Sequence, residues 1–156
     1  VLNIVEKLTE KYQVIHLTGH LDWETVSKAT LHLNSRYQAF PYLHEVGAAM
    51  AAADLVISRS GASALGEYPY FGLPAILVPY PYAWRYQKVN ADYLVERGAA
   101  VLLEDQRLIP DLWQTINDLM QDPNTLQSMS LAMKSLTHPQ AADNIAELLF
   151  EMAEAE

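Results

Sequence analysis

The fold is decided by residues 55–71, whose sequence reads LVISRSGASALGEYPYF. Residues 55–58 form a short apolar run between polar neighbours, which is typical of a buried parallel strand. Residues 59–63 are an arginine followed by four small residues, and they precede a helical segment, 65–71, that Gly72 terminates. The sequence therefore predicts a strand, a turn and a helix in succession, which is the building block of an α/β fold.

The same alternation of strands and helices extends through the rest of the chain. Four further strands are predicted at residues 14–18, 37–42, 75–78 and 99–103. Helices are predicted at residues 1–12, 22–33, 44–53, 86–97, 110–120, 123–136 and 139–154. Because short apolar strands separated by helices form parallel βαβ units, we expect an α/β fold with one open parallel sheet and helices on both faces. The length of 156 residues suits a single domain.

Composition and charge exclude several classes of protein. The net charge is −9 and the ten basic residues are scattered, so we expect no nucleic-acid partner. The chain has no cysteine, which excludes disulfides and thiolate metal sites, and its histidines lack metal-ligand spacing. We expect neither a membrane-spanning helix, which needs roughly 18 apolar residues, nor a signal peptide. The sequence thus favours a cytoplasmic protein without a metal site.

Ligands of open α/β sheets bind beyond the carboxyl ends of the strands, which points to the loops after Thr18, Phe40, Ser58 and Pro79. The turn at residues 59–63 is the most informative of these loops. Its backbone N–H groups precede a helix, and the positive end of a helix dipole favours an anion. The sequence therefore predicts a site for a diphosphate at this turn.

Individual side chains around the turn support this prediction. Gly61 permits close backbone approach, and the hydroxyls of Ser60 and Ser63 are candidate donors to the anion. The alternative is that one of these serines is an ordinary N-cap of the following helix. Glu67 lies about one turn further along and could accept hydrogen bonds from two ribose hydroxyls, or it could be a solvated surface acid.

Two amides lie on the next helical segment. Gln87 and Asn90 are three residues apart, so they project from one face of that helix. A neutral amide both donates and accepts hydrogen bonds, which suits the hydroxyls of a sugar. The alternative is that the pair belongs to an ordinary exposed surface.

Three blocks of sequence, taken in order, resemble a known family. They are DLVISRSGASALGE at residues 54–67, GLPAILVP at 72–79 and QKVNA at 87–91, and the similarity continues through residues 98–100 into the C-terminal helices. The blocks and their spacing resemble the C-terminal domain of the MurG family (glycosyltransferase family 28), the N-acetylglucosaminyltransferases that make the lipid-linked peptidoglycan precursor. The resemblance covers nearly the whole chain.

The resemblance implies the C-terminal half of a GT-B glycosyltransferase, in which two Rossmann-like domains enclose the active site and this half binds UDP-N-acetylglucosamine. It implies that Glu67 binds the ribose hydroxyls, that the backbone of Leu43 binds the uracil and that Gln87 contacts the sugar, with Asn90 nearby. Arg59 and the turn after it are implied to lie beside the diphosphate. The implied substrate-binding residues are Thr18, Leu43, Arg59, Ser60, Gly61, Ala62, Ser63, Glu67, Gln87 and Asn90.

The resemblance also implies parts that lie outside residues 1–156. We expect the family's first strand and Gly-rich loop, and the acceptor-binding N-terminal domain with the general base, to precede this nucleotide-sugar-binding domain. The domain alone is therefore expected to bind UDP weakly and to be inactive. The implied reaction is an inverting transfer of N-acetylglucosamine to the 4-hydroxyl of a lipid-linked N-acetylmuramoyl acceptor, without a cofactor or a tightly held metal. The whole enzyme is expected at the inner face of the plasma membrane.

Two other hypotheses stay open. A related UDP-sugar transferase that acts on another lipid-linked acceptor, such as a dolichol-linked one, would use the same pocket residues. A non-catalytic domain of the same fold would act instead through the aromatic-rich surface at residues 68–86. The joint presence of Arg59, Glu67, Gln87 and Asn90 favours a transferase.

Overall fold

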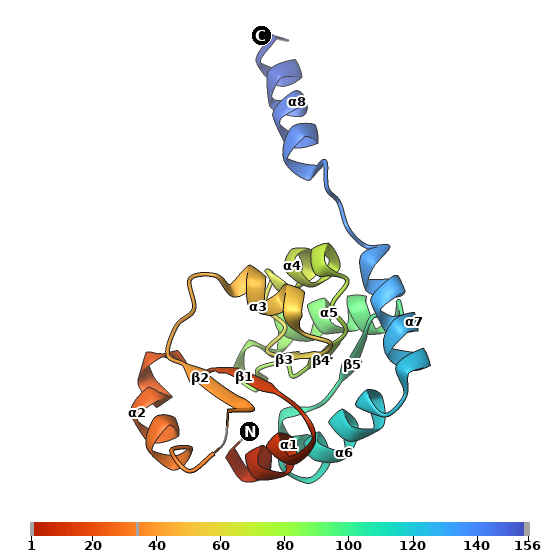
Figure 1. Cartoon of the computed structure of the whole chain (residues 1–156). Helices are drawn as coiled ribbons and strands as arrows, with labels where there is room; N and C mark the ends of the chain where they lie inside the picture. Colours follow the sequence, from red (N-terminus) through yellow and green to blue (C-terminus); the bar gives the residue numbers. More distant parts are fainter. Residues whose placement is uncertain (1, 34, 155–156) are drawn as a thin grey trace.

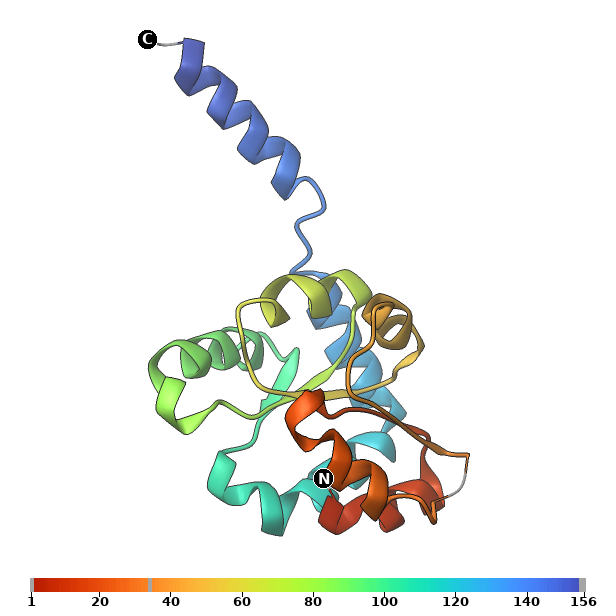
Figure 2. The same ribbon diagram turned by 90° about the vertical axis from the view of Figure 1, so that its left-hand side faces the viewer.

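The computed structural model describes residues 2–33 and 35–154, without the side chains of residues 83–85. Within these residues five strands occupy the predicted positions, each shorter than predicted by one to two residues. The strands are β1 (Val14–Leu17), β2 (Tyr37–Phe40), β3 (Val56–Ser58), β4 (Ala75–Leu77) and β5 (Ala100–Leu102). The predicted strands are therefore confirmed as elements, and helices cover both faces of them (Figures 1 and 2).

The predicted helices are also confirmed, with boundaries shifted by a few residues. They are α1 (Val5–Lys11), α2 (Gly19–Ala29), α3 (Val46–Ala52), α4 (Ala64–Phe71), α5 (Trp84–Val95), α6 (Leu108–Met120), α7 (Pro123–Lys134) and α8 (Ala141–Glu154), with 3-10 turns η1 (Leu2–Ile4), η2 (Pro81–Ala83) and η3 (Asp105–Arg107). The start of α7 illustrates the local cause. Pro123 occupies the first helical position, where its missing N–H costs nothing, and Asp122 accepts a hydrogen bond from Thr125 N at 3.1 Å.

The sheet differs from the prediction in one respect. All strand pairs are parallel, but they form two separate ladders, β1–β2 and β3–β4–β5. In Figure 1 β1 is the strand of its ladder on the side of β3. No strand of the described residues pairs with β1 along that side, so the backbone hydrogen bonding is interrupted there. The predicted parallel sheet is therefore present as two ladders within residues 2–33 and 35–154.

The core is built on both sides of β4. Ala75 and Leu77 belong to a buried cluster with α4 and α5, whereas Ile76 and Val78 belong to a second cluster with α1 and α6. This division follows from the two-residue period of a strand, which sends alternate side chains to opposite faces. Burial of a leucine or isoleucine side chain contributes about 1.5–3 kcal/mol, so the side chains of β4 stabilise the packing of helices on both of its faces.

The last helix stands apart from this core. None of the residues of α8 is buried, and it extends away from the rest of the molecule in both views (Figures 1 and 2). Its exposed apolar side chains are Ile145, Leu148, Leu149, Phe150 and Met152. None of the described helices is both long enough and apolar enough to cross a lipid bilayer.

The end of α5 gives a first test of the local structure. Gly98 has a φ of +70°, and a Cβ at this position would meet no atom within 4 Å. Replacing Gly98 by alanine therefore probes backbone strain alone, and we expect the free energy of unfolding to fall by about 1–2 kcal/mol. Urea denaturation measures this loss.

Gly66 supplies the matched control for that measurement. It lies inside α4 and also has open space where a Cβ would be built, but its φ is not in the left-handed region. Gly66→Ala is expected to raise the free energy of unfolding by about 0.5–1 kcal/mol, because alanine favours the helix. Equal losses in the two variants would contradict the strain at Gly98.

Candidate functional site

The turn between β3 and α4 presents free backbone donors. In the described part of the chain no acceptor bonds the N–H groups of Gly61, Ala62 or Ser63. Ser63 occupies the N-cap position of α4, but its hydroxyl makes no cap hydrogen bond, so the alternative that this side chain caps the first turn is wrong. Three successive free N–H groups at the positive end of α4 form the kind of cradle that binds phosphate oxygens.

Ser60 holds this turn in place. Its side chain has no exposed surface, and its hydroxyl donates to the backbone oxygen of Gln87 at 2.7 Å. Asn90 Nδ2 donates to the backbone oxygen of Ser60 at 3.0 Å. The turn is thus tied twice to α5. The expectation that the Ser60 hydroxyl donates to a ligand does not fit this geometry, because the hydroxyl is buried and already bonded.

Glu67 remains available on the outer side of α4. Its side chain is exposed and forms no hydrogen bond or ion pair with any described residue. The neighbouring Tyr68 points inward and donates to Ser58 Oγ at 2.7 Å. Burial raises the pKa of Tyr68, and Glu67 contributes to this increase, so the phenol stays protonated. Glu67 is therefore a free acceptor beside the turn.

Leu43 and Thr18 lie in loops that follow β2 and β1. The side chain of Leu43 is half-buried, and its backbone N–H and carbonyl bond no other described residue. The hydroxyl of Thr18 donates to the backbone oxygens of Gly19 at 2.9 Å and Phe40 at 3.3 Å. Leu43 therefore keeps its backbone groups free, whereas the Thr18 hydroxyl is used to close the loop after β1.

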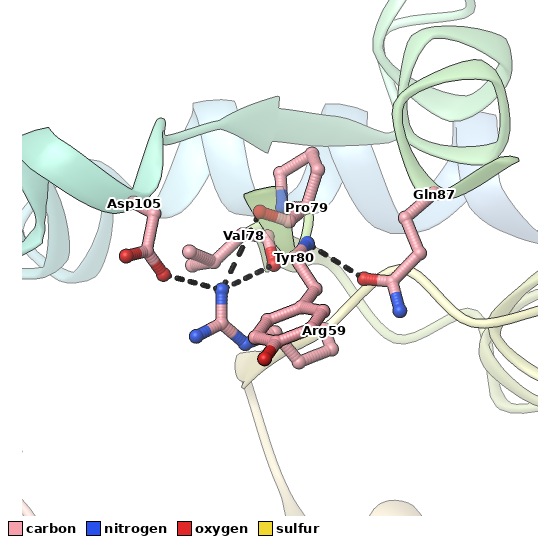
Figure 3. Close-up of polar contacts among 6 residues, drawn as sticks. All are labelled: Arg59, Val78, Pro79, Tyr80, Gln87 and Asp105. Carbon is pink, nitrogen blue, oxygen red and sulfur yellow. Dashed lines mark hydrogen bonds and ion pairs between the residues drawn. The ribbon is translucent and has the colours of Figure 1, made fainter. Parts of the chain in front are cut away.

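Arg59 connects three loops at the carboxyl ends of the strands. Its Nη1 lies 2.6 Å from Asp105 Oδ1, and it donates to the backbone oxygens of Val78 at 3.3 Å and Pro79 at 3.4 Å (Figure 3). The guanidinium also lies 5.3 Å from the centre of the Tyr80 ring. Arg59 follows β3, whereas its partners follow β4 and β5. The loop after Ser58 is thus fixed to its two neighbours.

Gln87 is oriented by the same group of residues. Its Oε1 accepts a hydrogen bond from Tyr80 N at 2.8 Å, so its side-chain amide contacts the loop after β4 (Figure 3). Its Nε2 has no acceptor among the described residues, and Asn90 Oδ1 has no donor among them. Each of the two amides therefore bonds the protein through one of its polar atoms, and the other polar atom remains available to a ligand.

Sequence reasoning missed Asp105. The rule that ligands and functional residues gather beyond strand carboxyl ends was applied to four loops only. Asp105 follows the fifth strand, β5, and it could have been found by extending the rule to that loop. Its pairing with Arg59, 46 residues away, has no signal in the sequence.

A cavity of about 260 Å³ lies elsewhere, beside β1 and α2. It is lined by Leu2, His16, Thr18, Asp22, Thr25 and Val26. His16 is half-buried, and its Nδ1 lies 2.7 Å from Tyr37 Oη. Burial lowers the pKa of His16, and Asp22 opposes the change. His16 is thus a half-buried residue of β1 that is hydrogen-bonded to Tyr37 on the neighbouring strand.

The fold and the candidate site define an α/β domain with backbone donors and a carboxylate at the carboxyl edge of a parallel sheet, the edge at which open α/β sheets bind ligands. The sequence matches the glycosyltransferase family 28 C-terminal domain over residues 1–145. The chain belongs to this family. The recognition made from the three sequence blocks is thereby confirmed.

Two curated relatives carry the same enzyme name. The protein of Chlorobium limicola is 37% identical over 98% of this chain, and that of Desulforudis audaxviator is 47% identical over 72% of it. Both are named UDP-N-acetylglucosamine–N-acetylmuramyl-(pentapeptide) pyrophosphoryl-undecaprenol N-acetylglucosamine transferase. The matches cover 42% and 31% of those proteins, so this chain corresponds to less than half of each relative.

Solved structures confirm the fold class. MurG of Acinetobacter baumannii superposes with a TM-score of 0.77 at 22% identity, covering 94% of this chain and 46% of that one. The glycosyltransferase VinC, solved with DTDP, gives a TM-score of 0.77 at 17% identity, covering 99% of this chain and 38% of that one. The chain therefore has the Rossmann-like α/β fold of the C-terminal half of a GT-B glycosyltransferase.

The tie between the turn and α5 can be tested by removing the Ser60 hydroxyl. Ser60→Ala loses one buried hydrogen bond to Gln87 O, so the free energy of unfolding is expected to fall by about 1 kcal/mol. Ser63→Ala is the control, because Ser63 is exposed and makes no cap. Urea denaturation of both variants measures the difference, and an unchanged stability in Ser60→Ala would contradict the tie.

The lowered pKa of His16 predicts a pH dependence of stability. The unfolded chain takes up a proton near the ordinary value of 6.5, whereas the folded chain does so only at lower pH. Stability is therefore expected to fall as the pH drops from about 7 to about 5, and this fall should be smaller in His16→Gln. Denaturation at several pH values measures it, with exposed His138→Gln as the control that should behave like the unaltered chain.

Proposed function

We propose that this chain is the UDP-N-acetylglucosamine-binding domain of an inverting hexosyltransferase, which adds N-acetylglucosamine to a lipid-linked peptidoglycan precursor. The observation that carries the proposal is the combination of three free N–H groups at Gly61, Ala62 and Ser63 with the free carboxylate of Glu67 one turn along the same helix. This spacing suits a diphosphate and its attached ribose. The names of the curated relatives support the choice of donor and acceptor.

In the proposed complex each part of the donor meets a different group. The diphosphate lies on the N–H groups of residues 61–63, and the ribose hydroxyls donate to Glu67. The uracil meets the free backbone groups of Leu43. Gln87 Nε2 and Asn90 Oδ1, the amide atoms that the fold leaves unused, contact the sugar. Thr18 shapes the loop after β1 through its two hydrogen bonds rather than through a free hydroxyl.

The proposed reaction is an attack of the acceptor hydroxyl on the anomeric carbon with departure of UDP. Negative charge accumulates on the diphosphate as the bond to the sugar breaks. Backbone donors and the dipole of α4 stabilise that charge without any reorganisation, so the domain contributes electrostatic stabilisation of the leaving group. The general base that takes the proton of the acceptor hydroxyl belongs, in this proposal, to the other half of the enzyme. No cofactor and no tightly held metal takes part in it.

The rest of the proposed enzyme fits the interrupted sheet. Curated relatives are more than twice as long as the matched region. We propose that the preceding half supplies a further parallel strand between β1 and β3, followed by a Gly-rich loop, and an acceptor-binding domain. Parallel strands with open edges readily accept such an addition, since their N–H and C=O groups are unpaired. We further propose that the whole enzyme works in the cytoplasm, peripheral to the inner face of the plasma membrane.

The donor can be tested by comparing UDP with 2′-deoxy-UDP and ADP. If Glu67 accepts hydrogen bonds from both ribose hydroxyls, UDP binds more tightly than 2′-deoxy-UDP. Glu67→Ala is expected to weaken UDP binding by about 10- to 150-fold, corresponding to about 1.5–3 kcal/mol, and to abolish the difference between the two uridine nucleotides. Titration calorimetry or amide shifts measure the affinities, in this chain and in the full-length protein.

Glu151→Ala is the matched control for this titration, because Glu151 is an exposed acid on α8, which extends away from the site. It should bind all three nucleotides like the unaltered chain. Equal affinity for UDP and ADP would overturn the uridine assignment, and an undiminished Glu67→Ala would overturn the ribose contact. Transfer by the full-length protein to a dolichol-linked but not to the N-acetylmuramoyl acceptor would favour the related transferases. No transfer to either would favour a non-catalytic domain.

A further inference from the structure

The ion pair between Arg59 and Asp105 joins the turn after β3 to the loop after β5. The two side chains are 45% and 39% exposed, so the pair is accessible from the site rather than enclosed in the core. The charged side chains next to Asp105 in the sequence have other partners. Arg107 is paired with Asp111, and Glu104 accepts from Gln106 Nε2 at 2.8 Å. Among the described residues, Asp105 therefore has Arg59 as its ion-pair partner.

The pair fixes the direction of the guanidinium. Nη1 is held by the carboxylate and by two backbone oxygens, those of Val78 and Pro79. Nη2 and Nε have no acceptor in the described part of the chain, and they point away from Asp105, Val78 and Pro79 in Figure 3. One edge of the guanidinium is thus bound to the protein, and the other is open to an anion.

The same contacts reach Gln87. The carbonyl of Pro79, which accepts from Arg59, belongs to the same peptide group as the N–H of Tyr80, which donates to Gln87 Oε1 at 2.8 Å. The guanidinium also lies against the ring of Tyr80 at 5.3 Å. Moving the guanidinium therefore disturbs the peptide that orients the amide of Gln87. Asp105 is therefore linked to Gln87, which is proposed to contact the sugar, through Arg59 and the peptide group between Pro79 and Tyr80.

We propose that Asp105 is a positioning residue for the donor diphosphate: it holds Arg59 so that the free edge of the guanidinium is turned toward the diphosphate before the ligand arrives. This inference rests on the proposed function. Without the carboxylate, the long arginine side chain samples several rotamers, and binding must order it at an entropic cost. The energetic advantage of Asp105 is therefore expected only for ligands that carry a diphosphate.

A double-mutant cycle with two ligands tests the proposal. Asp105→Ala is expected to weaken UDP binding about three- to tenfold and to leave uridine binding unchanged. Asp105→Asn keeps an oxygen acceptor for Arg59 Nη1, so its loss should be smaller. In an Arg59→Ala background, Asp105→Ala should have no further effect on UDP. The control is Glu24→Ala, which removes the exposed ion-pair partner of Lys28 on α2 instead and should bind both ligands normally.

Each other outcome has a defined meaning. A parallel loss of UDP and uridine affinity in Asp105→Ala shows a general structural role and overturns the inference. Tighter UDP binding in that variant shows that the carboxylate merely repels the diphosphate, and it also overturns the inference. An effect that persists in the Arg59→Ala background excludes action through Arg59. Failure of the unaltered chain to prefer UDP over ADP overturns the proposed function itself, which separates the two failures.

Discussion

Burial of β4 on both faces is the constraint on which the rest of the structure depends. Ala75, Ile76 and Leu77 have no exposed surface, and they divide between two core clusters that hold the helices on opposite sides. A strand buried in this way cannot shift by one residue without exchanging its two faces. Its register with β3 and β5 therefore fixes where all three strands end. The loops that form the site start from those ends.

The polar groups at these ends divide into those that bind protein and those that stay free. Ser60, Asn90 and one edge of Arg59 are used to join the loops after β3, β4 and β5 with the start of α5. The N–H groups of residues 61–63 and the carboxylate of Glu67 are left without partners in the described structure. A rigid frame of this kind lowers the entropic cost of binding, because the free groups are held in position beforehand.

Much of the fold could be predicted because its signals are local. Runs of four to six residues marked the strands, and Gly72 marked the end of a helix, where the structure gives it a left-handed backbone conformation. The continuity of the sheet was not predictable in the same way. β1 and β3 do not pair with each other. Which strand lies beside which is decided by the tertiary arrangement, because no property of either strand alone determines its neighbour.

In the candidate site, too, the local features could be predicted and the contacts between distant residues could not. The sequence by itself determined the strand–turn–helix unit at residues 55–71, the small residues of its turn and a carboxylate one helical turn away, because each follows from spacing along a single segment. Only the tertiary structure decided that the Ser60 hydroxyl is buried against Gln87 and that Arg59 meets Asp105. The physical reason is that a hydrogen bond is made with whichever partner the packing brings within about 3 Å, and that partner can lie anywhere in the sequence.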